Sequence, residues 1–234
     1  MADGPNGPLA RPGVVMEIWG PYALFTRPEA KTERVSYPVP TPNAAAGILR
    51  AVFWKPEIDF RVSMIEVLNP VAWHRITRNE VSSVVTREWA SKAMADPAVR
   101  FDAAADRDQR SALFLKDVHY RIHAWIQVHP GARANATAYR EQFQRRLARG
   151  ACFNQPCLGT RECVAEGFGP ARSKQALRGY TENLGPMLHS IDIREDGSET
   201  YSWYMPHIVD GVISVTGAGA QLPGDTEFGR RARA

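Results

Sequence analysis

The segment Leu113-Phe-Leu-Lys-Asp-Val-His-Tyr-Arg-Ile-His-Ala-Trp-Ile-Gln-Val128 alternates between two kinds of side chain. One phase is apolar except at a single lysine and contains Phe114, Lys116, Val118, Tyr120, Ile122, Ala124, Ile126 and Val128. The other phase is mostly polar and contains Asp117, His119, Arg121, His123, Trp125 and Gln127. Because successive side chains of a β-strand point to opposite faces, this pattern predicts a long strand with one buried face.

Shorter strands and a first helix are expected before this segment. The apolar run 14–19 predicts a strand that ends at Gly20-Pro21, and the runs 60–68 and 71–76 predict two more. Between them, Thr41 followed by Pro42 is typical of a helix N-cap with proline at the first helical position. We therefore expect a helix over residues 43–54 that Lys55-Pro56 ends.

A second helix is expected after the long segment. Residues 135–149 place Tyr139, Phe143 and Leu147 at i, i+4 and i+8, which is the spacing of a buried helix face. The opposite side of this helix is basic and contains Arg140, Arg145, Arg146 and Arg149. The region 82–110 has no clean period and predicts a surface excursion or a long hairpin.

The predicted order is strand, helix, strand, strand, helix, strand, which favours an α+β fold. It indicates a ferredoxin-like or RRM-like domain (βαββαβ) over residues 14–169, with two helices on one face of an antiparallel sheet and the other face open. Residues 170–216 predict a small C-terminal antiparallel β-sheet from the strands 187–193, 200–205 and 212–215. Residues 1–13 are interpreted as a disordered leader, and residues 217–234 as a flexible tail.

Composition excludes several classes of protein. The 234 residues are 44% hydrophobic and 23% charged, as in an ordinary globular protein. No membrane span and no signal peptide are recognisable, so a cytoplasmic location is expected. The three cysteines, Cys152, Cys157 and Cys163, match neither a zinc nor a redox spacing, so we expect reduced thiols, no metal site and no cofactor.

The basic residues are mostly arginine, and the formal net charge is +4. Arginine suits phosphate contacts and stacking on bases, although a GC-rich genome produces the same bias without any function. Aromatic residues alternate with cations in the loop that follows the first strand, as RNA binding requires. The candidate RNA-binding residues there are Tyr22, Phe25, Arg27, Lys31 and Arg34. The alternative is that these aromatic side chains pack on the core.

Four ordered blocks resemble a known family. They are Gly20-Pro-Tyr-Ala-Leu-Phe-Thr-Arg-Pro-Glu-Ala-Lys-Thr-Glu-Arg-Val-Ser-Tyr-Pro-Val39, Ala45-Ala-Gly-Ile-Leu-Arg-Ala-Val-Phe-Trp-Lys-Pro-Glu-Ile58, Arg78-Asn-Glu-Val81 and Gln155-Pro-Cys-Leu-Gly-Thr-Arg-Glu-Cys163. The chain resembles the subtype I-C member of the fifth CRISPR-associated (Cas) protein family, within the repeat-associated RNA-binding superfamily. A further match lies at Leu184-Gly-Pro-Met187.

The resemblance implies an endoribonuclease that cuts the CRISPR repeat at the base of its hairpin without a metal and stays on the 5′ handle. It also implies assembly with a backbone subunit and a large subunit into an RNA-guided complex that binds target DNA. The alternative is a non-catalytic scaffold that caps the handle. Further RNA-binding candidates are Arg78, Arg121, Arg140, Arg145, Arg146 and Arg161.

The catalytic residues of the family are not retained by type. Cleaving relatives carry a tyrosine at the position of Phe53 and a Lys-His pair that maps to Ala138 and Tyr139. Phe53 cannot move a proton. Substitute acid-base groups are Tyr139 itself and the two histidines of the long strand, His119 and His123. The alternative is a solvated strand face whose histidines only form hydrogen bonds.

Overall fold

The alternating segment forms the central strand, β5 (Arg107–Val128), in the computed structural model of the chain, which describes residues 13–30, 32–194 and 196–215. The apolar phase is buried as predicted, and Ile122 has no exposed surface. Strand β1 (Gly13–Ala23) pairs antiparallel with one edge of β5, and β3 (Ile58–Val67) pairs antiparallel with the other. The strand predicted from its period is therefore the centre of a mostly antiparallel sheet.

Strands β3 and β4 (Ala72–Val81) follow one another along β5. Val67 lies opposite Tyr120, and Ala72 lies opposite Lys116, so residues 68–71 are only a short break between two collinear strands. The break is fixed by the side-chain amide of Asn69, which donates to the carbonyl of Asp117 at 2.7 Å. Asp117 itself has a φ of 51°, in the left-handed region.

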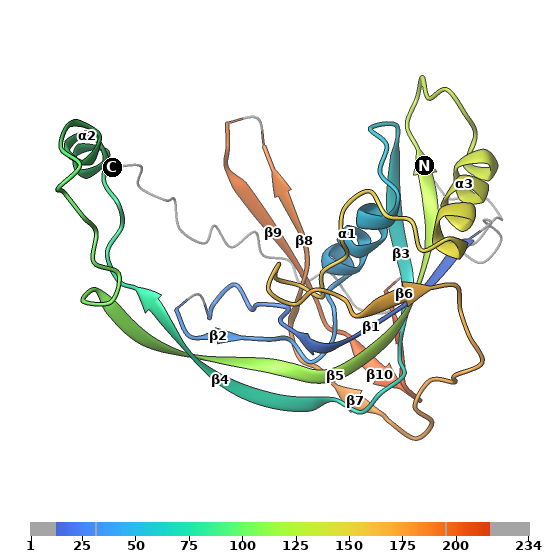
Figure 1. Cartoon of the computed structure of the whole chain (residues 1–234). Helices are drawn as coiled ribbons and strands as arrows, with labels where there is room; N and C mark the ends of the chain where they lie inside the picture. Colours follow the sequence, from blue (N-terminus) through green and yellow to red (C-terminus); the bar gives the residue numbers. More distant parts are fainter. Residues whose placement is uncertain (1–12, 31, 195, 216–234) are drawn as a thin grey trace.

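A long arm extends from the sheet (Figure 1). It consists of β4, the first half of β5 and, between them, the helix α2 (Arg87–Ala95). The arm agrees with the expected excursion over residues 82–110. Helix α2 was not anticipated from the sequence because it buries no residue and so has no apolar period.

Helices α1 (Pro42–Val52) and α3 (Ala136–Ala148) lie where two helices were predicted. The Thr41 hydroxyl caps α1 by accepting from the N–H of Ala44 at 3.2 Å. The Phe143 ring of α3 lies 5.4 Å from the Phe60 ring of β3, which places α3 on the apolar face of the sheet. Among the described residues, no helix is long and apolar enough to cross a membrane.

The C-terminal region departs from the expectation of a separate small sheet. Strand β11 (Val212–Ser214) pairs with β3, and β10 (His207–Val209) and β7 (Glu182–Asn183) continue from it, so these strands extend the main sheet. Such short strands need an existing edge to be stable. Among the residues that the structure describes here, β8 (Met187–Ile193) and β9 (Glu199–Tyr204) form a second, two-stranded sheet.

In the part of the chain that the structure describes, the main sheet has nine strands. Its path is β6-β1-β5-β3-β11-β10-β7, with β2 and β4 also beside β5. Strand β6 spans Gly167–Gly169, and β2 spans Arg34–Val35. Gly13, assigned to the leader from the sequence, is the first residue of β1, and the rest of the leader and the tail 217–234 lie outside the described residues.

Gly159 allows the loop after α3 to touch β1 closely. Its φ is +96°, and a Cβ at this position would lie 2.0 Å from the carbonyl oxygen of Leu24. Gly150 also has a positive φ, +65°, but a Cβ there would meet nothing within 4 Å. Comparing alanine variants of the two glycines therefore distinguishes the cost of backbone strain from the cost of a steric clash.

We predict that Gly150→Ala costs about 1–2 kcal/mol of unfolding free energy, the penalty of the left-handed conformation alone. Gly159→Ala adds the clash with Leu24 and is expected to cost clearly more. Urea unfolding followed by circular dichroism measures both. Equal losses in the two variants would show that the loop does not need this close contact.

Candidate nucleic-acid interface and cleavage site

The polar face of the sheet is built around Arg121. Its Nε and Nη2 donate to Oε1 of Glu17 on β1 at 3.0 and 2.6 Å, and its Nη1 donates to Oε2 of Glu66 on β3 at 2.6 Å. Both carboxylates lie directly opposite Arg121 in the strand register. The side chain of Glu17 has no exposed surface, so Arg121 balances a buried charge.

A later segment covers this face. The N–H of Arg172 donates to Glu17 at 2.8 Å, and Arg121 donates to the carbonyls of Arg172 and Lys174. Burial raises the pKa of Glu17, but the hydrogen bonds from Arg172 and Arg121 outweigh it, so the pKa of this carboxyl is lowered. The expectation of an open face is therefore corrected, because Arg121 and the segment after β6 close it.

The two histidines of this face are each paired with a carboxylate. Nε2 of His119 lies 3.3 Å from Glu17, and Nε2 of His123 lies 2.6 Å from Glu66. Burial lowers the pKa of His119. At four residues apart on a strand they are roughly 13 Å from each other. Tyr139 lies on the helix-covered side, so His119, His123 and Tyr139 do not form one site.

We predict that Arg121→Met lowers the unfolding free energy by about 3–5 kcal/mol, because it leaves the buried charge of Glu17 unpaired. The matched control is Arg110→Met on the same strand, whose partners Glu80 and Asp108 are partly exposed and whose loss should cost about 1 kcal/mol or less. Thermal and urea unfolding measure both. Similar losses would contradict the structural role of Arg121.

Phe53 and Tyr139, which the sequence resemblance led us to expect at catalytic positions, lie close together. Phe53 caps the end of α1, and Tyr139 lies in the first turn of α3, with ring centroids 6.4 Å apart. The Tyr139 hydroxyl donates to the carboxylate of Glu57, just before β3. This hydrogen bond raises the pKa of Tyr139, so the phenol is protonated at neutral pH and is a proton donor.

Sequence reasoning missed two polar groupings at the start of β3, one around the His129 side chain and one around the Tyr139 hydroxyl. Nε2 of His129, just after β5, lies 3.0 Å from Oδ2 of Asp59, and the backbone N–H of His129 donates to the carbonyl of Glu57 at 2.9 Å. Nε of Arg133 lies 3.6 Å from Glu57. The sequence drew attention to this region only through a histidine next to Pro130. The carboxylate partner of that histidine, Asp59, can be identified only once β3 is paired with β5. We refer to Glu57, Asp59, His129, Arg133 and Tyr139 as the junction cluster.

The junction cluster has the groups needed for acid-base chemistry on a phosphodiester. With Asp59 accepting from Nε2, Nδ1 of His129 is the nitrogen that can accept a proton. The imidazole is 43% exposed, so a substrate can reach it. Arg133 is almost fully exposed and supplies a positive charge beside Tyr139 and Glu57. Acid, base and cation therefore lie at one end of the sheet.

The aromatic residues of the loop after β1 pack against protein. Phe25 is buried and lies edge-on to Tyr120, with centroids 6.0 Å apart. Tyr22 stacks on His74 at 5.4 Å. Arg27 lies over the Tyr37 ring at 4.9 Å, and Lys31 lies outside the described residues. The loop packs its aromatic side chains, as the alternative interpretation held.

The candidate RNA-binding arginines fall into two groups: those that contact other protein groups, and those whose guanidinium is available to a ligand, which we call open arginines. Arg34 and Arg78 both reach Glu80 and Glu162, which ties β2 and β4 to the loop after α3. On α3, Nε of Arg146 donates to the carbonyl of Val52 at 3.1 Å. Arg145 and Arg161 are exposed, and Arg140 is half-buried. These last three are the better placed for phosphate contact.

The chain was compared with known proteins. Residues 13–216 match a family model described as Cas_Cas5d, CRISPR-associated protein (Cas_Cas5). The chain is 41% identical to the CRISPR pre-crRNA endoribonuclease Cas5d of Mannheimia succiniciproducens over 86% of this chain and 93% of the relative. It is 43% identical to the protein of that name from Thermus thermophilus over 77% of this chain and 74% of the relative.

A solved structure described as a CRISPR-associated protein has a similar fold. It matches with a TM-score of 0.64 at 21% identity, over 92% of this chain and 95% of that one. A functionally uncharacterized protein from Streptococcus mutans matches with a TM-score of 0.62 at 21% identity, over 87% and 92%. At this identity the two structures support the fold alone.

Proposed function

Because the chain belongs to the Cas5d family of CRISPR-associated proteins, we propose that it is an endoribonuclease that cuts pre-crRNA at the base of the repeat hairpin. The observation that carries this proposal is the identity of 41% and 43% to two relatives named as pre-crRNA endoribonucleases. After cutting, the protein stays on the 5′ handle as a subunit of the surveillance complex, beside its backbone and large subunits. Target DNA is then bound by that complex.

The junction cluster is where the proposed cut occurs. The ribose 2′-hydroxyl attacks the adjacent phosphorus and gives its proton to Nδ1 of His129, while the bond from phosphorus to the 5′-oxygen breaks. Tyr139 donates its proton to that leaving oxygen, and its raised pKa keeps the phenol protonated at neutral pH until then. Arg133 and Arg140 neutralise the phosphate during the reaction. The products are a 2′,3′-cyclic phosphate and a 5′-hydroxyl.

The fold proposed for the RNA-binding domain is ferredoxin-like. The four strands β6-β1-β5-β3 are neighbours in this order, and α1 and α3 connect them in the sequence pattern βαββαβ. In this arrangement His119 and His123 hold the sheet together through Glu17 and Glu66 and have no part in the cut.

A second candidate function is a non-catalytic scaffold that caps the handle. It is favoured by one observation: the ring at the position of the family's tyrosine is that of Phe53, buried against Tyr139 and without a proton to transfer. In this case the open arginines Arg140, Arg145 and Arg161 would still bind RNA, while another protein would process it.

We predict that the purified protein cuts labelled repeat RNA in EDTA and leaves a 2′,3′-cyclic phosphate, because the attacking group belongs to the RNA. Tyr139→Phe and His129→Gln should each slow single-turnover cleavage by about 10²-fold or more, the usual loss for an acid-base group. The matched control is His123→Gln, which removes the histidine–carboxylate pair with Glu66, outside the junction cluster, and should keep the rate. If His123→Gln is inactive and His129→Gln cuts normally, the junction cluster is not the site.

The scaffold alternative has its own test. The triple variant Phe53→Tyr, Ala138→Lys and Tyr139→His places the family's residue types at the mapped positions. If the natural protein binds the repeat without cutting it and the triple variant cuts at the hairpin base, the scaffold reading holds. If the natural protein cuts, a repeat with a 2′-deoxyribose at the cut site should bind equally well and stay intact, because the nucleophile is absent.

A further inference from the structure

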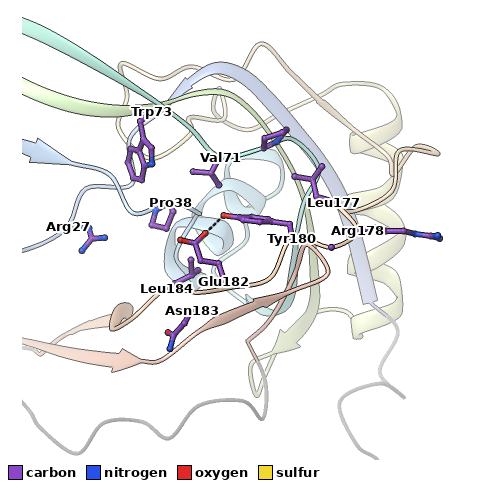
Figure 2. A pocket seen from close by; sticks show the side chains of 12 residues that line it. Arg27, Pro38, Val71, Trp73, Leu177, Arg178, Tyr180, Glu182, Asn183 and Leu184 are labelled. Carbon is purple, nitrogen blue, oxygen red and sulfur yellow. Dashed lines mark hydrogen bonds between the residues drawn. The ribbon is translucent and has the colours of Figure 1, made fainter.

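A pocket of about 640 Å³ opens at the end of β3 that is remote from the junction cluster (Figure 2). This volume is within the usual range for sites that hold small molecules or parts of larger ligands. Three segments that are far apart in the sequence form its walls: the loop after β1, the start of β4 and residues 177–184. Its apolar side chains are Pro38, Pro70, Val71, Leu177 and Leu184.

The most unusual wall residue is Trp73 on β4. Trp73 is 45% exposed, whereas its neighbour His74 points to the other side of the strand and stacks on Tyr22. Figure 2 shows Trp73 extending from the strand toward the part of the pocket that Pro38 and Arg27 line. An exposed indole beside a concave apolar surface suits a flat, aromatic ligand, and stacking of a nucleobase on such a ring contributes about 1–3 kcal/mol.

Two polar groups complete the pocket. The Tyr180 hydroxyl donates to Oε2 of Glu182 at 2.5 Å, and this bond holds the carboxylate at the pocket (Figure 2). A carboxylate only accepts hydrogen bonds, so it favours a base edge that carries an amino group. On the opposite wall the guanidinium of Arg27 rests on the Tyr37 ring, and its Nε is buried without a hydrogen-bond partner among the described residues.

We propose that this pocket binds one unstacked nucleobase of the RNA strand, with a preference for a base that has an exocyclic amino group. Trp73 stacks on the base, Glu182 accepts a hydrogen bond from the amino group, and Arg27 contacts the adjoining phosphate or ribose. The proposal rests on the proposed function, because it assumes that repeat RNA is the ligand. It adds a site that reads sequence to a protein whose other candidate contacts are to phosphate.

The position of the pocket indicates which nucleotide it holds. Glu57 precedes β3 and Val71 follows it, and a strand of 10 residues spans roughly 33 Å. An RNA strand that reaches from the junction cluster to the pocket must therefore contain several nucleotides. The bound base belongs to the retained single-stranded segment, at a distance from the scissile phosphate.

The test is an abasic scan of a repeat RNA that carries 2′-deoxyribose at the cut site. With the natural protein, removal of one particular base of the single-stranded segment should weaken binding about tenfold, which corresponds to about 1.4 kcal/mol. In the Trp73→Ala variant, removal of that base should not weaken RNA binding any further. In the Trp73→Phe variant, removal of the base should again weaken binding by nearly as much as in the natural protein. The control Trp54→Ala removes a tryptophan of similar exposure outside the pocket and should keep the full penalty at that position.

Base substitution at that position tests Glu182. Uracil in place of the preferred base should weaken binding to the natural protein, and Glu182→Gln should remove most of this discrimination, because an amide can also donate. If every abasic position has the same effect in Trp73→Ala as in the natural protein, while the unmodified repeat still binds and is cut, the pocket proposal is wrong and the proposed function stands. The same holds if Trp73→Ala impairs only binding to a partner protein. If the natural protein neither binds nor cuts repeat RNA, both fail.

Discussion

The pairing of Arg121 with Glu17 and Glu66 is the interaction on which the rest of the structure depends. One guanidinium joins the three central strands, since its two carboxylate partners come from β1 and β3. Any slip in strand register would leave Glu17 buried without a counter-charge, which is far more costly than the loss of an exposed ion pair. The same guanidinium holds the backbone of residues 172 and 174, so the segment that leads to the pocket is anchored on the closed face.

Closing the polar face determines where RNA can bind. An RNA-recognition sheet usually presents its open face to bases, but here the face has Arg172 over Trp19 and carboxylates against each histidine. The proposed sites for RNA then lie at the two ends of β3, in addition to the arginines of α3 and of the loop after it. One end has the junction cluster with an acid, a base and a cation, and the other has Trp73 and Glu182 beside a cavity. In the proposed arrangement, cleavage and base recognition are therefore separated along a single strand.

The parts of the fold that the sequence predicts are those with local causes. Three such features depend on residues that are close in the chain. They are the alternation of side chains in β5, the N-cap of α1 at Thr41, and the buried face of α3 made by Tyr139, Phe143 and Leu147. Pairings between distant segments were not predictable. The sequence could not indicate that Arg121 faces two carboxylates, or that Phe25 packs edge-on against Tyr120 instead of facing solvent. For the same reason β10 and β11 could not be assigned to the edge of β3.

The candidate site likewise contains residues that the sequence could identify and residues that only the structure brings together. Tyr139 was identified through a family position, whereas Glu57, Asp59 and His129 became partners only when Ile58 was placed opposite Val128. This register brings Glu57 and Asp59 to the end of the sheet at which His129 and Tyr139 also lie. Glu57 raises the pKa of Tyr139, and in the proposed mechanism the protonated tyrosine supplies a proton while the histidine takes one. On the proposed mapping of the Lys-His pair of cleaving relatives to Ala138 and Tyr139, the proposed mechanism divides the tasks of acid and base between α3 and the end of β5.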